Sequence, residues 1–248
     1  MEDWDFYVAP VDDQNASIFV DLGLFESAPE ADRPCLLRVA TPLLAPREDG
    51  LSDDAETEAL YGLEDLLFAQ VARGLQARYV GRMTTQGRRE FFYYGASGAG
   101  LERAIATVQQ AFPQYPLQHS SRDDRDWQLF FDVLYPSELD LQSIQTRRVV
   151  QELLDQGDDL SVPREVTHTA YFPSPHARDQ FVQQLAPEGF RITLDDLAEP
   201  DAEYRFGARL SRVDRVDLEA IDALVIDLYL RIGTLGGEYD GWETELRN

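Results

Sequence analysis

The run Gly95-Ala96-Ser97-Gly98-Ala99-Gly100 is the stretch of this sequence whose residue types are best suited to holding a ligand. It follows an apolar segment and precedes a helical pattern, where backbone N–H groups can bind a phosphate. Its spacing is neither G-x-G-x-x-G nor that of a P-loop, and a nucleophile elbow needs G-x-S-x-G. Ser97 is therefore predicted to cap the helix. The alternative is a small-ligand or enzymatic site between Gly95 and Gly100, lined by Arg88, Arg89 or His119.

Other groups that could do chemistry do not occur at the spacings that such chemistry needs. The histidines His119, His168 and His176 include no pair at the i, i+4 spacing of a helical metal site. Cys35 is the only cysteine, which excludes an internal disulfide and a thiolate zinc cluster. The paired aspartates do not follow the calcium-loop pattern. The sequence thus predicts no catalytic residue, no cofactor and no metal.

Charge and composition narrow the class of partner. The 248 residues carry a net charge of −24, 44% of them are hydrophobic, and all 22 basic residues are arginine. Such acidity argues against direct nucleic-acid binding, which depends on clustered positive charge, and favours a basic protein partner. The acidic N-terminus does not resemble a secretory signal, and no segment approaches the roughly 20 apolar residues of a membrane span. We expect a cytoplasmic protein without a membrane contact.

Alternating and helical patterns in the first half predict a hairpin followed by a βαββαβ unit. The expected strands cover residues 4–9, 17–22, 35–41, 78–84, 89–95 and 127–134. The expected helices cover residues 53–75 and 101–112. A boundary is expected at Tyr135-Pro136-Ser137.

The second half repeats the same order of elements after a helix over residues 141–154. Strands are expected over residues 166–172, 189–194 and 204–210 and around Trp242, and helices over residues 175–185 and 217–235. The sequence therefore predicts an α+β protein of two ferredoxin-like (βαββαβ) sandwich domains with antiparallel sheets, residues 1–136 and 137–248.

The last forty residues contain the clearest amphipathic helix. Its apolar stripe has steps of three and four and consists of Leu218, Ile221, Val225, Leu228, Ile232 and Leu235. The acids Asp217, Glu219, Asp222 and Asp227 fall largely off that stripe. We therefore expect one side of this helix on a core and an acidic side in solvent.

Both halves resemble known families. The run Ser211-Arg212-Val213-Asp214, the acidic helix and Gly236-Gly237-Glu238-Tyr239-Asp240-Gly241-Trp242 resemble the regulator of ribonuclease E activity B family, and the likeness covers roughly residues 140–248. The opening Asp3-Trp4-Asp5-Phe6-Tyr7 and the stretch RREFFYYG resemble a bacterial domain family of unknown function. The first resemblance implies a non-enzymatic cytoplasmic inhibitor that binds an arginine-rich, largely disordered part of an endoribonuclease.

An acidic surface suits such a basic partner because complementary charge raises the association rate and selects the partner. The residues expected to contact it are Asp217, Glu219, Asp222, Asp227, Glu238 and Asp240 for charge, with Tyr239 as an aromatic anchor. Trp242 is expected in the core. That these acids form a merely solvated face is an equally open interpretation. The task of the first domain and the oligomeric state stay open.

Overall fold

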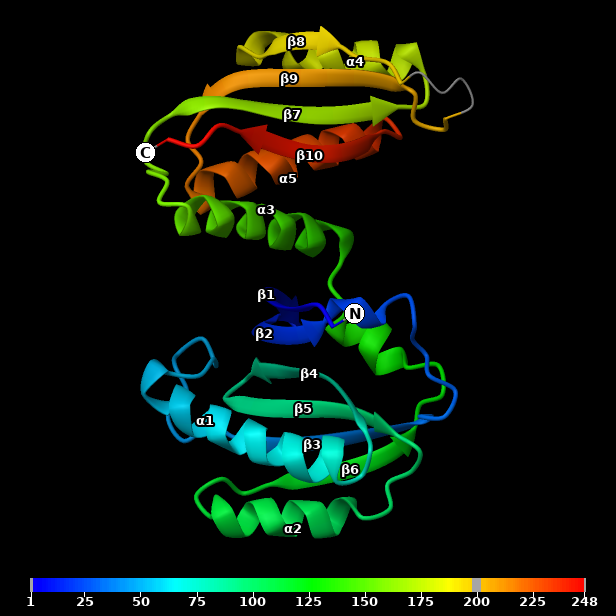
Figure 1. Ribbon diagram of the computed structural model, residues 1–248, viewed down its shortest axis with the longest axis vertical. Coiled ribbons are helices and arrows are strands. Elements are labelled where there is room, and N and C mark those ends of the chain that lie inside the picture. Colours follow the sequence, from blue (N-terminus) through cyan, green and yellow to red (C-terminus); the bar gives the residue numbers. More distant parts are fainter. Residues whose placement is uncertain (1, 198–201, 248) are drawn as a thin grey trace. The chain divides into compact units, whose positions relative to one another are not determined.

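The computed structural model describes residues 2–197 and 202–247, and the chain divides into two compact units, Met1–Ser137 and Glu138–Asn248. Both are α+β units built on antiparallel sheets, as the sequence predicts (Figure 1). Within the described residues, no helix has the length and apolarity needed to cross a bilayer.

Unit 1 is built on a six-stranded sheet in the order β1-β2-β4-β5-β3-β6. Its strands are β1 (Trp4–Val11), β2 (Gln14–Asp21), β3 (Cys35–Pro42), β4 (Arg78–Thr85), β5 (Arg88–Gly95) and β6 (Gln118–Asp123). Its α-helices are α1 (Asp54–Leu67) and α2 (Leu101–Ala111). Shorter helical turns are the 3-10 helix η1 (Leu22–Leu24) and the π-helices η2 (Phe68–Arg73) and η3 (Phe130–Leu134).

The core of unit 1 lies between α1, α2 and one face of the sheet. Leu60, Leu63 and Leu67 of α1 are fully buried there, because their spacing places them on one side of the helix. Asp53 begins α1 as a cap, since its carboxylate accepts a hydrogen bond of 2.8 Å from the N–H of Ala55.

The expected strand over residues 127–134 is wrong: β6 lies earlier, and the chain from Gln128 to Leu134 is helical. Trp127, Phe130 and Leu134 are buried at helical spacing, and Asp124 accepts the N–H of Gln128 at 2.9 Å. The true edge strand β6 is exposed and polar throughout. It is held in the sheet by backbone pairing with β3. Because its side chains do not alternate between apolar and polar, the sequence does not indicate a strand at this place.

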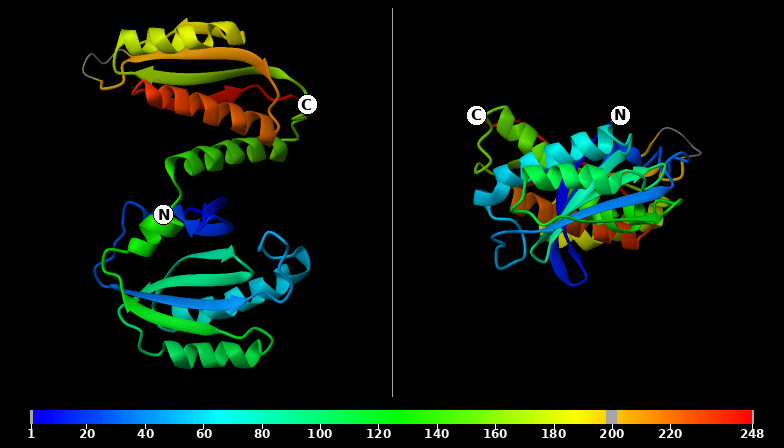
Figure 2. Two further views of the ribbon diagram at one scale, coloured as in Figure 1. Left: turned by 180° about the vertical axis from the view of Figure 1, so that it is seen from behind. Right: turned by 90° about the horizontal axis from the view of Figure 1, so that it is seen from below.

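Unit 2 is built on a four-stranded sheet in the order β10-β7-β9-β8. Its strands are β7 (Arg164–Phe172), β8 (Arg191–Leu194), β9 (Phe206–Asp214) and β10 (Glu238–Thr244). Its helices are α3 (Glu138–Asp155), α4 (Pro175–Leu185), the 3-10 helix η4 (Ala186–Glu188) and α5 (Leu218–Thr234). Seen from behind, α4 and α5 lie in front of this sheet (Figure 2).

Four positions of the expected apolar stripe form the centre of the unit 2 core. Ile221, Val225, Leu228 and Ile232 of α5 are buried, whereas Leu218 is 40% exposed. Helix α3 packs against α5 and adds Val150 and Leu153 to the same core. The side of α5 that faces away from the sheet is therefore partly covered by another helix.

Candidate functional site

The turn between β5 and α2 is a packed connection. A Cβ atom at Gly98 would lie 2.3 Å from the Oγ of Ser121, so β6 closes on this turn. Gly100, with a φ of 85°, is the residue before the helix, which corrects the expectation that Ser97 is the cap. The Oγ of Ser97 accepts a local hydrogen bond of 3.3 Å from the N–H of Ala99.

The basic residues expected at this turn are not brought together. Arg88 forms an ion pair of 2.7 Å with Glu90. Arg89, the next residue of the strand, is buried and donates to Thr84 at 2.8 Å. Adjacent strand residues point to opposite faces of a sheet, so the two guanidiniums cannot line one pocket. Together with the exposed His119 on edge strand β6, they do not form the site that the turn suggested.

The histidines lie in separate environments. His168 is fully buried on β7, and its Nδ1 lies 2.8 Å from the hydroxyl of Tyr239. Burial lowers the pKa of His168 to about 4, so the ring is neutral at pH 7. His176 is exposed in the first turn of α4. Among the described residues, no group of three or more metal-ligating side chains is placed to hold an ion.

Three of the expected partner-binding acids already have partners within unit 2. Asp217 caps α5 and pairs with Arg215 at 2.8 Å. Asp222 accepts a hydrogen bond of 3.1 Å from Ser143 of α3. Asp227 pairs with Arg231 at 2.7 Å, one turn along the helix. The expected free acidic face of α5 is therefore wrong in part, because α3 and neighbouring arginines engage these carboxylates.

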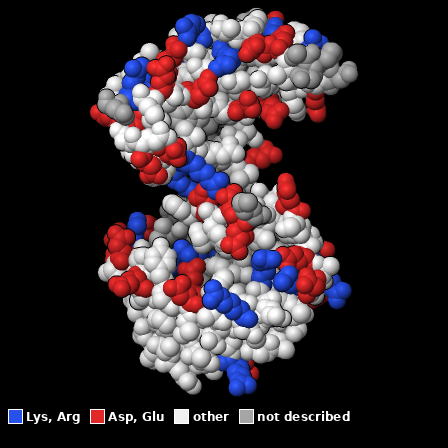
Figure 3. Space-filling view, viewed as in Figure 1, with Lys and Arg blue, Asp and Glu red and all other residues white. Residues whose placement is uncertain are grey.

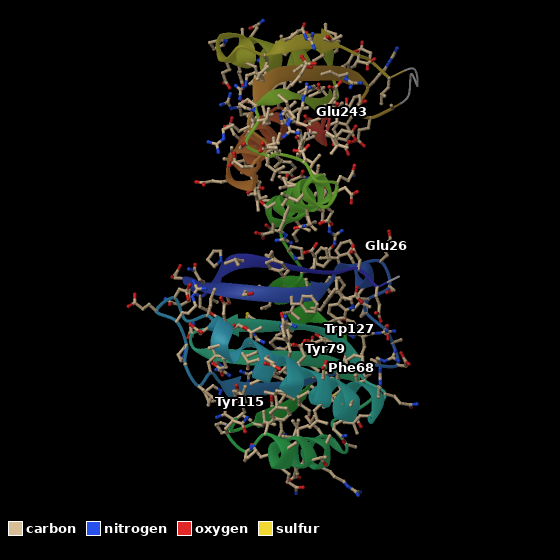
Figure 4. The ribbon with its side chains drawn as sticks, turned by 60° about the vertical axis from the view of Figure 1, so that its left-hand side comes forward. Glu26, Phe68, Tyr79, Tyr115, Trp127 and Glu243 are labelled. Carbon is tan, nitrogen blue, oxygen red and sulfur yellow. The ribbon has the colours of Figure 1, made fainter. Side chains whose placement is uncertain are left out.

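The remaining expected acids, Glu219, Glu238 and Asp240, are exposed. Two of them lie on β10, an edge strand that also carries Glu243, and Glu245 follows directly after it. We call Glu238, Asp240, Glu243 and Glu245 the acidic edge. Glu243, labelled in Figure 4, pairs with Arg209 of β9. Sequence reasoning missed Glu243 and Glu245, although their alternation near the end of a strand was visible.

The two aromatic residues of β10 both face the core of unit 2. Tyr239 is 8% exposed and belongs to the core, so it cannot be an exposed anchor. Trp242 is partly buried and packs against the same core. The reason is a β-bulge between Tyr239 and Gly241, where Asp240 is the extra residue. The bulge lets Tyr239 and Trp242 pair with Ala170 and His168, which both point into the core.

A groove of 220 Å³ lies between α3, the middle of α5 and β10. Val149 and Trp242 supply its apolar surface, and Gln142, Gln145 and Asp240 supply polar groups. We call it the edge groove. It brings an aromatic ring and a carboxylate together beside the acidic edge.

Comparison with known proteins separates the two units. Residues 2–135 match the family described as “Family of unknown function (DUF695)”. The chain belongs to this family. Residues 143–244 match the family described as “Regulator of ribonuclease activity B”, which confirms the resemblance expected for the second half of the chain. A search of curated proteins found no match.

One solved structure is similar at a low level. It is titled “Crystal structure of putative glycine cleavage system transcriptional repressor” and is 11% identical, with 85% of this chain and 98% of that chain covered. Its TM-score of 0.23 is too low to support an argument about fold or function. The match to the DUF695 family lies within unit 1, and the match to the regulator family lies within unit 2.

The residues that line the aromatic cavity of the DUF695 unit do not include those of the glycine-rich turn. The cavity has a volume of 570 Å³ and lies beside α1, η2, β2 and β4. Trp4, Phe19, Phe68 and Tyr79 contribute rings to it, together with four arginines. In this unit the polar and aromatic groups thus converge at a place that sequence spacing did not indicate.

Proposed function

We propose that this protein is a non-enzymatic regulator that binds an endoribonuclease of the ribonuclease E type and modulates RNA degradation in the cytoplasm. The observation that carries the proposal is the match of residues 143–244 to the regulator family. The acidic surface of unit 2 supports it, because a basic, arginine-rich segment is the partner that such a surface attracts. Acidic side chains are visible on the face of unit 2 seen in Figure 3.

We propose the edge groove and the acidic edge as the contact surface. Arginine stacks on aromatic faces and pairs with carboxylates, and Trp242 and Asp240 offer both partners within one groove. Glu238 and Glu219 add exposed charge. Asp217, Asp222 and Asp227 contribute to the local negative field while they keep their structural partners. Tyr239 supports the strand from inside the core.

We also propose that both units are ferredoxin-like domains, residues 1–136 and 137–248. In each unit the strands of the βαββαβ segment have the order 4-1-3-2, counted along the chain, and β1 and β2 extend the first sheet. Such a fold by itself says nothing about activity. The ribonuclease proposal therefore depends on the surface of unit 2 and on the family match.

The test is a double charge reversal on the acidic edge. The full-length E238K/D240K variant should bind purified endoribonuclease at least about tenfold more weakly than the wild type, a loss of about 1.4 kcal/mol. It should also fail to slow RNA cleavage by that enzyme at concentrations where the wild type does.

The control is E26K/E58K, which makes the same change in charge at two exposed acids of unit 1. Its affinity should stay within about twofold of the wild type, since the change lies outside the proposed contact. If both variants lost the same amount of binding affinity, net charge alone would explain the effect, and the edge groove would be refuted as the contact site. Wild-type protein that neither binds nor slows the nuclease would refute the function.

A further inference from the structure

The cavity of the DUF695 unit combines an aromatic surface with an excess of arginine. Its volume of 570 Å³ lies within the range of small-molecule sites. Four arginines line it (Arg33, Arg73, Arg78 and Arg82), against three acids (Glu2, Glu64 and Asp65). In a protein with a net charge of −24, a cavity with more basic than acidic groups is a local exception.

The aromatic rings provide stacking surfaces. Trp4 stacks on Phe19 with centroids 5.0 Å apart and on Tyr79 at 5.4 Å. Phe68 meets Tyr79 edge-on at 6.1 Å, and Figure 4 shows these two side chains next to each other. Tyr61, also at the cavity, is 51% exposed. Partly exposed rings around an open space can take a further planar group.

One side of the cavity is held rigid by a buried hydrogen-bonded cluster. Glu64 accepts a hydrogen bond of 2.7 Å from the hydroxyl of Tyr79 and contacts of 2.6 Å from Arg82. Arg82 also lies over the ring of Phe19 at 4.4 Å. Burial and the nearby Glu64 raise the pKa of Tyr79, so that its hydroxyl stays protonated and keeps this bond. Such a preorganised surface lowers the entropic cost of binding.

The other arginines have spare capacity for an anion. Arg33 and Arg78 both pair with Glu30, and Arg33 also contacts the exposed Asp32 at 3.5 Å. The Nε of Arg33 is buried without a hydrogen-bond partner among the described residues. Arg73 is exposed, lies 5.3 Å from the ring centre of Phe68, and has no ion pair within the described part of the chain. Both Phe68 and Arg73 belong to the π-helix η2, an irregularity that often occurs at functional sites.

We propose that this cavity binds a planar aromatic ligand with a negative charge, and that its ligand class is a nucleoside 5′-monophosphate, free or at the end of an RNA strand. The base would stack on the accessible part of the half-buried Trp4 ring, and the guanidinium of Arg73 would pair with the phosphate. The site involves unit 1 alone and does not depend on the ribonuclease proposal. It adds a ligand to a domain family without an assigned task.

The test is calorimetric titration of the full-length protein with adenosine 5′-monophosphate. We expect saturable binding with a Kd below about 1 mM, and at least tenfold weaker binding of adenosine or of inorganic phosphate alone. The R73Q variant should bind about tenfold more weakly, and so should W4L, because each removes one of the two recognition elements. The matched control R103Q, at an exposed arginine of α2, should bind like the wild type.

Two results would overturn the proposal: no saturable binding of the monophosphate at millimolar concentration, or equal affinity of R73Q and the wild type. R73Q keeps the test valid if W4L fails to fold, because Arg73 is exposed.

A 5′-phosphorylated RNA trinucleotide distinguishes the two sources of the ligand, a free nucleotide and the end of an RNA strand. Tighter binding than the mononucleotide, with the same dependence on Arg73, indicates an RNA end. Equal binding indicates a free nucleotide.

Discussion

At the scale of single residues, burial decides which side chains are left for function. Tyr239 and His168 form a pair inside the core of unit 2, where burial raises the pKa of the tyrosine and lowers that of the histidine. The Nε2 of His168 has no partner among the described residues. The buried neutral imidazole and the phenol belong to the core. Because the pKa of His168 is lowered there, the stability of the fold should depend on pH.

The folded state should lose stability relative to the H168Q variant as the pH falls below about 6.5, the ordinary pKa of histidine. The pKa of His168 in the folded state is lowered to about 4. Between pH 6.5 and pH 4 the unfolded chain therefore binds one proton more than the folded chain, and the population of the unfolded state rises. The difference should reach about 2 kcal/mol between pH 7 and pH 5. Urea unfolding at both pH values measures it. If the free energy of unfolding depended on pH in the same way in both proteins, the pKa of His168 would be the same in the folded and the unfolded chain.

At the scale of elements, the edge strand β10 depends on a clamp at the start of β7. Arg164 donates to both carboxylate oxygens of Asp158 at 2.6 and 2.7 Å, and both side chains are fully buried. Arg164 also donates to the backbone oxygen of Glu245, and Asp158 accepts the N–H of Arg247 at 2.7 Å. The clamp thus ties the segment before β7 to the residues after β10. Hydrogen bonding to Arg164 lowers the pKa of Asp158.

Replacing Asp158 by asparagine should destabilise unit 2 by about 3 kcal/mol at pH 7, because a buried guanidinium loses its charge partner. The contribution of a carboxylate with a lowered pKa is fully present above its unfolded value of about 4 and is lost as the pH falls through its folded value. The difference in the free energy of unfolding between the wild type and D158N should therefore become smaller below about pH 4. Denaturant unfolding across pH 3 to 7 tests this.

The exposed Asp155 provides the comparison for that variant. D155N should change the free energy of unfolding by less than about 0.5 kcal/mol, as surface substitutions usually do. If D158N were as mild as D155N at pH 7, the clamp would contribute nothing beyond an exposed ion pair.

At the scale of the whole molecule, charge is distributed over both units. Residues 1–136 contain 23 acidic and 11 basic residues, and residues 137–248 contain the same numbers, so each half has a net charge of −12. Net charge therefore attracts a basic partner without selecting a surface. Selection has to come from local geometry such as the edge groove.

The association rate with an arginine-rich partner should fall by at least about tenfold between 0.05 and 0.5 M salt, because screening shortens the reach of the protein's field. The dissociation rate should change much less, since contacts inside the groove are less screened than long-range attraction. Surface plasmon resonance with the full-length protein resolves the two rates. An association rate that does not depend on salt would exclude electrostatic attraction as the basis of recognition.

The sequence alone determined the two halves, their βαββαβ order and most helix positions, because apolar spacing records which side of each element is buried. It also carried the resemblance to both families, through motifs such as Gly236 to Trp242. It could not reveal β6, whose polar residues are held only by backbone pairing, nor the bulge that brings Trp242 onto the same side as Tyr239. Only the tertiary structure decided which acids remain free, because Ser143 of α3 and nearby arginines engage the others. It also gathered Trp4, Phe19, Phe68 and Arg73, far apart in the chain, around one cavity.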